Sequence, residues 1–201
     1  MPEDKSRRNF WQSRYREGNI PWDLGEPSRP VRWLVEHHFP PTGKVLIPGC
    51  GRGHEALYLA ERGYQVTAVD LVAEPLEYLR KAARKSSLEI EILQQDIFEL
   101  APRYNDAFDV FLEQTFFCSI DPLLYVDYAV LAYRALKPGG QLLGVFMEVL
   151  WEGGPPHNCP PDLVLEQFPA ARWRKENAKP FTPKNPARPG PEYTLRLVKK
   201  G

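Results

Sequence analysis

Residues 44–70 constrain the fold of this chain more than any other stretch. A short apolar run, Val45–Ile47, leads into a turn rich in glycine; a helix-patterned segment follows, and a second apolar run, Val66–Val69, ends on Asp70. Glycine lets the backbone adopt positive φ and approach a ligand, and a helix N-terminus offers free N–H groups. An acid at the end of the second strand can accept hydrogen bonds from ribose hydroxyls. The stretch therefore predicts an α/β unit that holds the adenosine part of a cofactor.

The spacing of the glycines distinguishes between kinds of cofactor. They stand at 49, 51 and 53, and His54 occupies the sixth position of the pattern. A dinucleotide fingerprint has glycine or alanine at that position, so that the helix can lie close beneath a pyrophosphate. The sequence therefore disfavours a nicotinamide oxidoreductase. Glycine turns also occur in ordinary α/β loops, and from the turn alone that structural alternative stays open.

The rest of the chain continues the alternation of strands and helices. Further helices are predicted over Ala73–Ser86, Asp121–Leu136 and Pro160–Phe168, and further strands over Leu88–Gln95, Phe108–Leu112, Gln141–Met147, Ala170–Asn177 and Glu192–Lys199. Prolines at 180, 183, 186, 189 and 191 predict a loop over 180–191. The pattern is typical of a Rossmann-like α/β fold, a mostly parallel seven-stranded sheet with helices on both faces. We expect one domain over residues 1–201.

The segment before this core, residues 1–43, is rich in aromatic side chains. They are Phe10, Trp11, Tyr15, Trp22 and Trp33. The first three fall on one face of a predicted helix, and Ser28 is placed to cap a second helix. The aromatic rings either cover one edge of the sheet or close over a cofactor, since adenine and a sulfonium both favour aromatic neighbours. Composition alone leaves both readings open.

Composition and charge exclude several classes of function. Lys+Arg and Asp+Glu each number 26, so no net charge attracts nucleic acid or an anionic membrane, and the basic residues at 80–85 have the spacing of a solvated helix face. Three cysteines without a CxxC and four scattered histidines predict neither a disulfide framework nor a metal site. No apolar run approaches the roughly 20 residues of a membrane span, and the first residues lack the apolar segment of a signal peptide. We therefore expect a cytoplasmic protein.

Two further groups of candidate residues follow the third and fourth predicted strands. Asp96 and Ile97 suit adenine, one bonding its amine and the other packing on its ring, although Asp96 can instead cap a helix. Gln114, Thr115 and Phe116 come just after the fourth predicted strand. Cys118 is either a nucleophile or, as is commoner for this residue type, a buried structural cysteine.

Six motifs extend these observations over residues 10 to 157: FWQSRYREGNIPWDLGEP, PGCGRGHEALYLAERGYQVTAVDL, QQDIF, LEQTFFCSIDP, LKPGG and GGPPH. Together they resemble the thiopurine methyltransferase superfamily, and within it the thiol and halide methyltransferase branch. LKPGG is common among methyltransferases, whereas the leader joined to PGCG and EQTFFC is far more specific. The resemblance implies a class I methyltransferase fold, S-adenosylmethionine as cofactor, S-adenosylhomocysteine as product, and a helical lid over residues 1–43 upon a core of 44–201. Pro48 fits this family as well. Most class I methyltransferases have an acid just before the first glycine, whereas this family has proline there.

The resemblance also implies which residues bind the ligands. The implied cofactor contacts are Trp11, Tyr15 and Trp22 in the lid, and Gly49, Cys50, Gly51, Asp70, Leu71, Asp96, Ile97 and Gln114 in the core. The implied acceptor contacts are Trp22, Thr115, Phe116 and Phe146. Phe146 stands where thiol and halide relatives often have a tyrosine, so this chain lacks that hydroxyl.

The implied reaction is methyl transfer to a small soft nucleophile, such as a thiol, hydrosulfide, halide or thiocyanate, by in-line displacement. An acceptor that arrives ionised needs proximity and exclusion of water but no general base, so we name no catalytic residue. The alternatives are a thiopurine, an aromatic thiol or a selenium or tellurium compound as acceptor, or a non-catalytic binding module. A nucleic-acid or protein-amide methyltransferase usually has Asn/Asp-Pro-Pro-aromatic at the place of Glu113–Phe116. We expect a small-molecule acceptor and a monomer.

Overall fold

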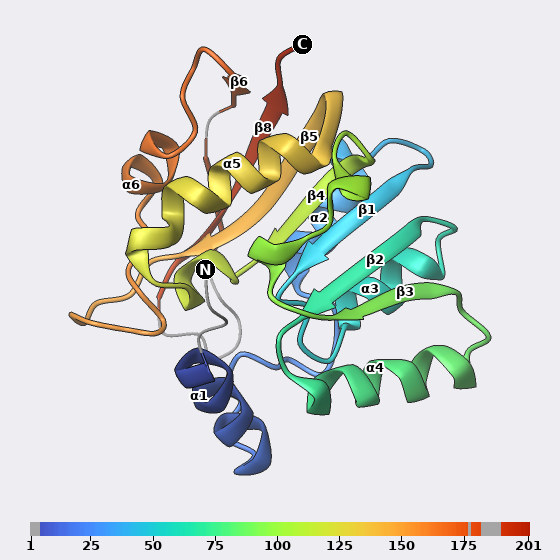
Figure 1. The fold of residues 1–201 in the computed structure, drawn as a ribbon. Coiled ribbons are helices and arrows are strands. Elements are labelled where there is room, and N and C mark those ends of the chain that lie inside the picture. Colours follow the sequence, from blue (N-terminus) through green and yellow to red (C-terminus); the bar gives the residue numbers. More distant parts are fainter. Residues whose placement is uncertain (1–4, 177, 182–189) are drawn as a thin grey trace.

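The computed structural model describes residues 5–176, 178–181 and 190–201. Its centre is a sheet of eight strands in the order β3-β2-β1-β4-β5-β8-β6, with β7 also paired to β8 (Figure 1). The strands are β1 (Lys44–Pro48), β2 (Gln65–Asp70), β3 (Ile90–Gln94), β4 (Phe108–Gln114), β5 (Leu136–Met147), β6 (Trp173–Lys175), β7 (Lys179–Phe181) and β8 (Glu192–Lys199). Strands β1 to β5 are parallel to their neighbours, and β8 lies antiparallel to β5. The predicted mostly parallel sheet is confirmed.

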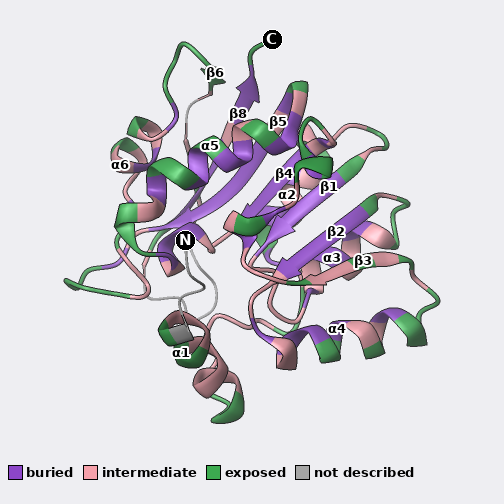
Figure 2. Ribbon diagram, viewed as in Figure 1, coloured by how far each residue is buried: buried purple, intermediate pink, exposed green. Residues whose placement is uncertain are grey.

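Helices cover both faces of the sheet, as predicted. One face carries α2 (Arg29–His38), α3 (His54–Ala60) and α4 (Ala73–Lys85), and the other carries α5 (Tyr125–Ala135) and α6 (Pro161–Glu166). Parallel strands need such crossover segments, because a two-residue turn cannot bring the chain back to the same end. Figure 2 shows the central strands as a buried layer between exposed helix faces. The carboxyl ends of β1, β2 and β4 consequently meet at one edge.

The sheet has eight strands where the sequence predicted seven. The additional strand is β7, whose last two residues fall in the predicted loop 180–191; residues 182–189 of that loop lie outside the described part. Strands β6 and β7 pair with successive parts of the same edge of β8, as Trp173 opposite Lys199 and Pro180 opposite Tyr193 show. Proline is tolerated at such an edge, where its missing N–H interrupts no inner ladder. The loop prediction was wrong here because a long β8 offered an unpaired edge.

Three other boundaries differ from the predictions. The helix predicted from Asp121 begins with a short 3₁₀ segment, η4 (Pro122–Leu124), before α5. The strand predicted over Gln141–Met147 begins earlier, at Leu136, so that the LKPGG segment belongs to β5, with a register shift against β4. The strand predicted over Ala170–Asn177 is shortened to β6, and residue 177 is outside the described part.

The N-terminal segment divides into two parts with different packing. The helix α1 (Lys5–Arg16) contacts α4 beside the carboxyl ends of the strands (Figure 1). The helix α2 instead belongs to the core, because its Val31 and Leu34 are fully buried with Val45 of β1. Within the predicted lid of residues 1–43, α2 thus packs on the sheet, whereas α1 lies near the strand ends.

Candidate functional site

A cavity of about 330 Å³ lies at the carboxyl ends of the parallel strands. Its volume is at the lower end of the roughly 300–1,000 Å³ of small-molecule sites, and its position is where open α/β sheets bind ligands. The candidate residues that line it are Trp11, Tyr15, Trp22, Gly49, Asp70, Leu71, Asp96, Ile97, Gln114, Thr115 and Phe116. The fold thus brings together residues from α1, from the turn after β1 and from the ends of β2, β3 and β4.

Three other candidates lie elsewhere. Cys50 and Gly51 line a smaller cavity of about 70 Å³ that shares Gly49 with the first. Phe146 is fully buried, with its ring centroid 5.7 Å from that of Phe117, and the structure does not bring it to either cavity. The next residue of β5, Met147, lines the larger cavity.

The glycine turn brings its backbone close to the cavity. Gly49 and Gly51 both have φ of +53°, which is strained for residues with a side chain. A Cβ on Gly49 would stand 1.9 Å from the ring of Phe116, and one on Gly51 would stand 3.1 Å from the hydroxyl of Tyr15. Only glycine at 49 therefore leaves room for both the backbone and the aromatic ring that faces it.

Asp70 is the last residue of β2 and lies beside this turn. Hydrogen bonds from the backbone orient both of its carboxylate oxygens. One oxygen accepts a hydrogen bond from the backbone N–H of Gly51 and the other from that of Val72, each at 2.9 Å. Burial raises the pKa of Asp70, and these N–H groups oppose that shift. A carboxylate has about four acceptor positions, so each oxygen can still accept from a vicinal hydroxyl pair.

These features fit an adenosyl group. The cradle at Gly49 would be filled by a Cβ, and Asp70 is fixed where a ribose is expected. Nε2 of Gln95 also lines the cavity, is buried, and has no hydrogen-bond partner among the described residues. That amide is a free donor for an acceptor atom of a ligand.

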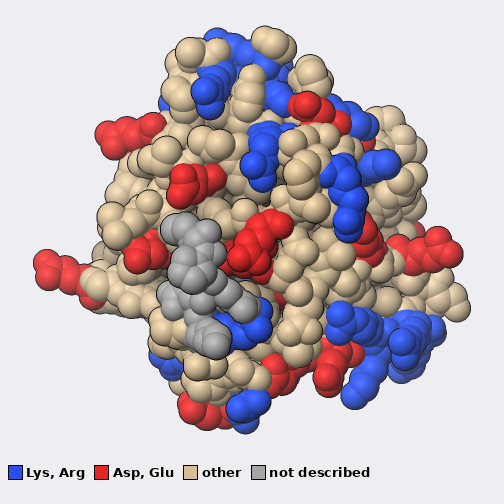
Figure 3. Space-filling model, viewed as in Figure 1, with Lys and Arg blue, Asp and Glu red and all other residues tan. Residues whose placement is uncertain are grey.

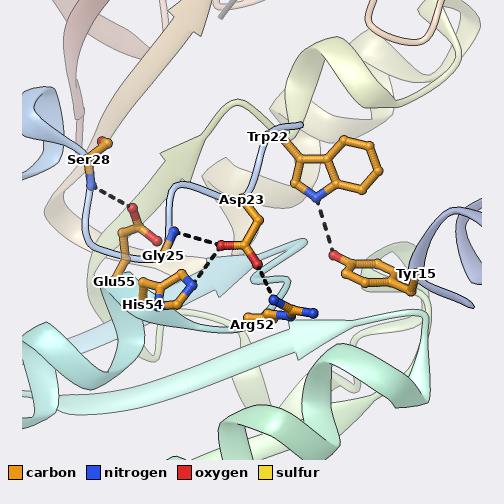
Figure 4. Close-up of polar contacts among 8 residues, drawn as sticks. All are labelled: Tyr15, Trp22, Asp23, Gly25, Ser28, Arg52, His54 and Glu55. Carbon is orange, nitrogen blue, oxygen red and sulfur yellow. Dashed lines mark hydrogen bonds and ion pairs between the residues drawn. The ribbon is translucent and has the colours of Figure 1, made fainter. Parts of the chain in front are cut away.

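Aromatic side chains of α1 and of the N-terminal strap, which we define as residues 17–28, form one wall. The ring of Trp22 meets Trp11 edge-on at 5.4 Å and Tyr15 edge-on at 5.9 Å between centroids. Nε1 of Trp22 donates to the hydroxyl of Tyr15 at 3.4 Å (Figure 4). Burial raises the pKa of Tyr15, so this phenol stays neutral. A wall of this kind favours a cationic sulfonium and a planar base.

The N-terminal strap is fixed to the glycine turn through Asp23. Its carboxylate accepts from Nε2 of His54 at 2.8 Å and from the N–H of Gly25 at 2.9 Å, and it forms an ion pair with Arg52 at 3.1 Å (Figure 4). Burial raises the pKa of Asp23, but the bonds from His54 and Gly25 outweigh it and the net pKa is lowered. The same bond raises the pKa of His54. In the sequence, His54 was significant only because it replaces the glycine or alanine of a dinucleotide fingerprint, so its bond to Asp23 was not predicted.

Asp96 caps the 3₁₀ segment η1 (Ile97–Glu99) and also lines the cavity. Its carboxylate accepts from the N–H of Phe98 at 3.1 Å and forms an ion pair with Arg7 of α1. The capping role was the alternative left open by the sequence, and it coexists with a place at the cavity. Arg7 was not predicted, because pairing across so many residues leaves no local signal.

The end of β4 is fixed by a buried acid. Glu113 is fully buried and accepts the backbone N–H groups of Phe116 and Phe117 and the hydroxyl of Tyr128. Burial raises the pKa of Glu113 to about 7. These bonds hold the loop that carries Thr115, whose φ is +52°. The loop therefore presents its side of the cavity in one conformation.

Cys118 also lines the cavity, from the 3₁₀ segment η3 (Phe117–Ser119). The residue is buried, and its Sγ donates to the carbonyl of Thr115 at 3.0 Å. This supports the structural reading of the cysteine. Within the described ranges, no group of three or more His, Cys, Asp or Glu side chains is placed to hold a metal ion.

Comparison with known proteins identifies the family. The model of the family described as thiopurine S-methyltransferase matches residues 6–180. The chain belongs to this family. A probable thiol methyltransferase 2 of Arabidopsis thaliana is 32% identical over 152 residues, which are 73% of this chain and 66% of the relative. The matched part therefore spans slightly less than two thirds of that relative.

Two further comparisons extend this result. A thiopurine S-methyltransferase of Legionella pneumophila (strain Paris) is 24% identical over 175 residues, 79% of each chain. The crystal structure of the Burkholderia thailandensis 1,6-didemethyltoxoflavin-N1-methyltransferase, with bound 1,6-didemethyltoxoflavin and S-adenosylhomocysteine, superposes with a TM-score of 0.80. It covers 96% of this chain and 87% of its own, at 22% identity. The fold of this family member is thus that of the class I methyltransferases, as predicted.

The surface of this methyltransferase family member carries both signs of charge. Figure 3 shows acidic and basic side chains interspersed over the visible face, with positive charge gathered over α4. Lys81, Arg84 and Lys85 of that helix are exposed, as the solvated-face reading predicted. None of the helices in the described ranges has the length and apolar character needed to cross a membrane.

Proposed function

We propose that the chain transfers a methyl group from S-adenosylmethionine to a small soft nucleophile, such as a thiol, hydrosulfide, halide or thiocyanate. One observation carries the proposal. Among the described residues that line the larger cavity there is no histidine, lysine or glutamate, and its two acids, Asp70 and Asp96, already accept protein hydrogen bonds. A site without a free general base suits an acceptor that arrives ionised.

The chain's own residues then hold and orient the cofactor. We assign Asp70 to the ribose hydroxyls, Gly49 to close backbone approach, and the rings of Trp11, Tyr15 and Trp22 to the adenosyl and sulfonium side. When bound, S-adenosylmethionine supplies an activated methyl carbon. The aromatic wall excludes water and restricts the approach of the acceptor. Alignment of this kind can contribute on the order of 7–11 kcal/mol to lowering a barrier.

The acceptor end is mostly apolar. It is lined by Thr115, Phe116, Cys118, Ile120, Met147 and Trp151. Polarisable and weakly hydrated nucleophiles lose little on entering such a pocket, whereas a strongly hydrated oxygen nucleophile would lose its water without a replacement donor. The names of the relatives, a thiol methyltransferase and a thiopurine S-methyltransferase, agree with transfer to sulfur.

Calorimetry and a turnover screen test the proposal. We expect S-adenosylmethionine and S-adenosylhomocysteine to bind the wild type and binding to be lost in Asp70→Ala, with Asp127→Ala on the far side of α5 as the control. The screen covers hydrosulfide, thiocyanate, iodide, aromatic thiols, thiopurines, and selenium and tellurium oxyanions. If neither S-adenosylmethionine nor S-adenosylhomocysteine binds the wild type, the proposed methyltransferase activity is refuted. The alternative of a non-catalytic binding module would then stand. If turnover is confined to thiopurines, aromatic thiols, or selenium or tellurium compounds, that class would replace small soft nucleophiles as the proposed methyl acceptor.

Three further properties belong to the proposal. We propose a cytoplasmic protein that acts as a monomer and has no nucleic-acid partner. The equal numbers of acidic and basic residues support the last of these three properties. Size-exclusion chromatography with light scattering checks the monomer.

A further inference from the structure

Arg14 is a charged residue of the cavity that no acid neutralises. It lines the cavity from α1, and its contact with the described residues is with the ring of Phe10, 5.1 Å from the guanidinium carbon to the centroid. No carboxylate among the described residues forms an ion pair with it. By contrast, the other arginine of the cavity, Arg7, is paired with Asp96.

The surrounding charges leave the site near Arg14 positive. The helix α1 contains no acidic residue, and the nearest acids of the cavity are already engaged, Asp96 by Arg7 and Asp70 by backbone N–H groups. The guanidinium of an arginine carries a permanent positive charge and is weakly hydrated. The cavity thus contains a permanent positive charge, that of Arg14, for which the described residues supply no counterion.

The side chain of Arg14 lies on the face of α1 opposite α4. Gln12 and Arg16 both bind Glu74 of α4, each at 3.1 Å. With 3.6 residues per turn, Arg14 points roughly 160° away from each of them. In Figure 1, α4 lies on one side of α1 and the segment after β5 on the other, and Trp151 and Pro155 of that segment line the same cavity as Arg14. Arg14 therefore lies on the face of α1 away from α4, in the cavity that Trp151 and Pro155 also line.

We propose that Arg14 determines specificity by charge, favouring methyl acceptors that carry a negative charge. The inference rests on the proposed methyl transfer and adds to it a residue that selects ionised acceptors over neutral ones. Phe10 holds the guanidinium at the cavity without neutralising it. Methylation of an anion such as thiocyanate gives a neutral molecule, so the attraction that binds the acceptor does not retain the product.

The test compares an anion with its neutral methylated form. Thiocyanate and methyl thiocyanate are titrated by calorimetry into protein saturated with S-adenosylhomocysteine, whose sulfur is uncharged, so that Arg14 is the unpaired positive charge facing the ligand. We expect Arg14→Gln to lower the affinity for thiocyanate about tenfold or more and to leave the affinity for methyl thiocyanate within about twofold of the wild-type value. Arg14→Lys should retain most of the thiocyanate affinity. Arg16→Gln, which removes the same charge from the side facing α4, is the matched control and should have little effect.

Turnover gives a second, independent readout. In Arg14→Gln we expect the KM for thiocyanate and for iodide to rise about tenfold, with the KM for S-adenosylmethionine unchanged. Equal losses in Arg14→Gln and Arg16→Gln would overturn the inference, because general helix charge would then be responsible. An equal loss of affinity for thiocyanate and for methyl thiocyanate in Arg14→Gln would also overturn the inference. So would the absence of thiocyanate and iodide binding to the wild type. These outcomes are distinct from failure of the proposed function, which would appear as loss of cofactor binding in the wild type.

Discussion

The glycine turn and α1 line the same cavity but are held in place by different interactions. The turn is fixed by the backbone, with the N–H of Cys50 bonded to the carbonyl of Val69 at 3.0 Å and the N–H of Gly51 to Asp70 at 2.9 Å. The helix α1 is fixed by side chains, through Arg7 with Asp96 and through two contacts of α4 with Gln12 and Arg16.

This difference has a consequence for stability. Backbone bonds in a partly buried turn between two strands form together with the sheet, whereas an exposed ion pair contributes about 0–1 kcal/mol. The Arg16–Glu74 pair is of this weak kind, with side chains 66% and 34% exposed. We therefore expect α1 to separate from the core at much lower cost than the turn can deform. Substitutions in the two regions should differ accordingly.

The largest effect is expected at Gly49. An alanine there combines strain at positive φ with a Cβ 1.9 Å from the ring of Phe116, and should lower the free energy of unfolding by roughly 2–4 kcal/mol. Gly63→Ala is the matched control, because φ is +83° and no described atom lies within 4 Å of the added Cβ. It should cost about 1–2 kcal/mol. Urea unfolding measures both, and equal losses would show that Phe116 does not restrict the turn.

The next effect is expected at Trp22, where the aromatic wall is joined. Trp22→Ala removes the edge contacts with both Trp11 and Tyr15. It should lower the affinity for S-adenosylhomocysteine, measured by calorimetry, by about 10- to 100-fold. Trp33→Ala is the control, since Trp33 stacks on His37 outside the cavity. An unchanged affinity in Trp22→Ala would remove the residue from the cofactor site.

The link between Asp23 and His54 predicts a pH dependence. His54 has a raised pKa, so its contribution is fully present below the ordinary value of 6.5 and is lost as pH rises through the raised pKa. Asp23 has a lowered pKa, so its contribution is present above 3.8 and is lost as pH falls through the lowered pKa. The link is therefore strongest between these limits and weakens on the alkaline side.

Asp23→Asn tests this dependence. The free energy of unfolding should fall by about 1–2 kcal/mol at pH 6, and the difference from wild type should shrink toward pH 9. Thermal unfolding in a pH series measures it, with Asp162→Asn in the first turn of α6 as a control away from the cavity. A difference that does not change with pH would mean that His54 does not titrate against Asp23.

The smallest effects are expected at the contacts of α1 with the core. Arg7→Gln breaks a largely buried pair, with side chains 19% and 10% exposed, and should lower stability by about 1 kcal/mol. Arg16→Gln breaks the exposed pair and should change stability by less than about 0.5 kcal/mol. Chemical denaturation, together with hydrogen exchange of α1, measures both. Equal effects would show that burial does not separate the two contacts.

The sequence predicted the parts of the molecule that depend on local pattern. The strand, glycine turn, helix and terminal acid over 44–70 were read correctly, because strand alternation, positive φ and helix periodicity are local properties. The family was likewise recognisable from contiguous motifs. The eighth strand was missed, because Pro180 reads as a loop residue, and only the open edge of β8 gives it a partner.

The site was predictable where it depends on strand ends and not where it depends on distant side chains. Asp70, Asp96 and Gln114 follow strands, and parallel topology brings strand ends together whatever the connecting helices are. The pairing of Arg7 with Asp96 and of Asp23 with His54 leaves no such signal, since each joins segments far apart in the chain. Phe146 illustrates the limit, because its position in β5 was correct but the structure turns its ring toward Phe117.

The sequence by itself determined the fold class, the family and the glycine turn that we propose as the cradle for an adenosyl group, because each depends on residues close together in the chain. Tertiary structure decided what surrounds that cradle. It placed α2 in the core and α1 at the cavity, it engaged Asp96 and Asp70, and it left Arg14 without an ion-pair partner among the described residues. Such pairings depend on the relative position of whole elements, which is set only when the two faces of the sheet have packed.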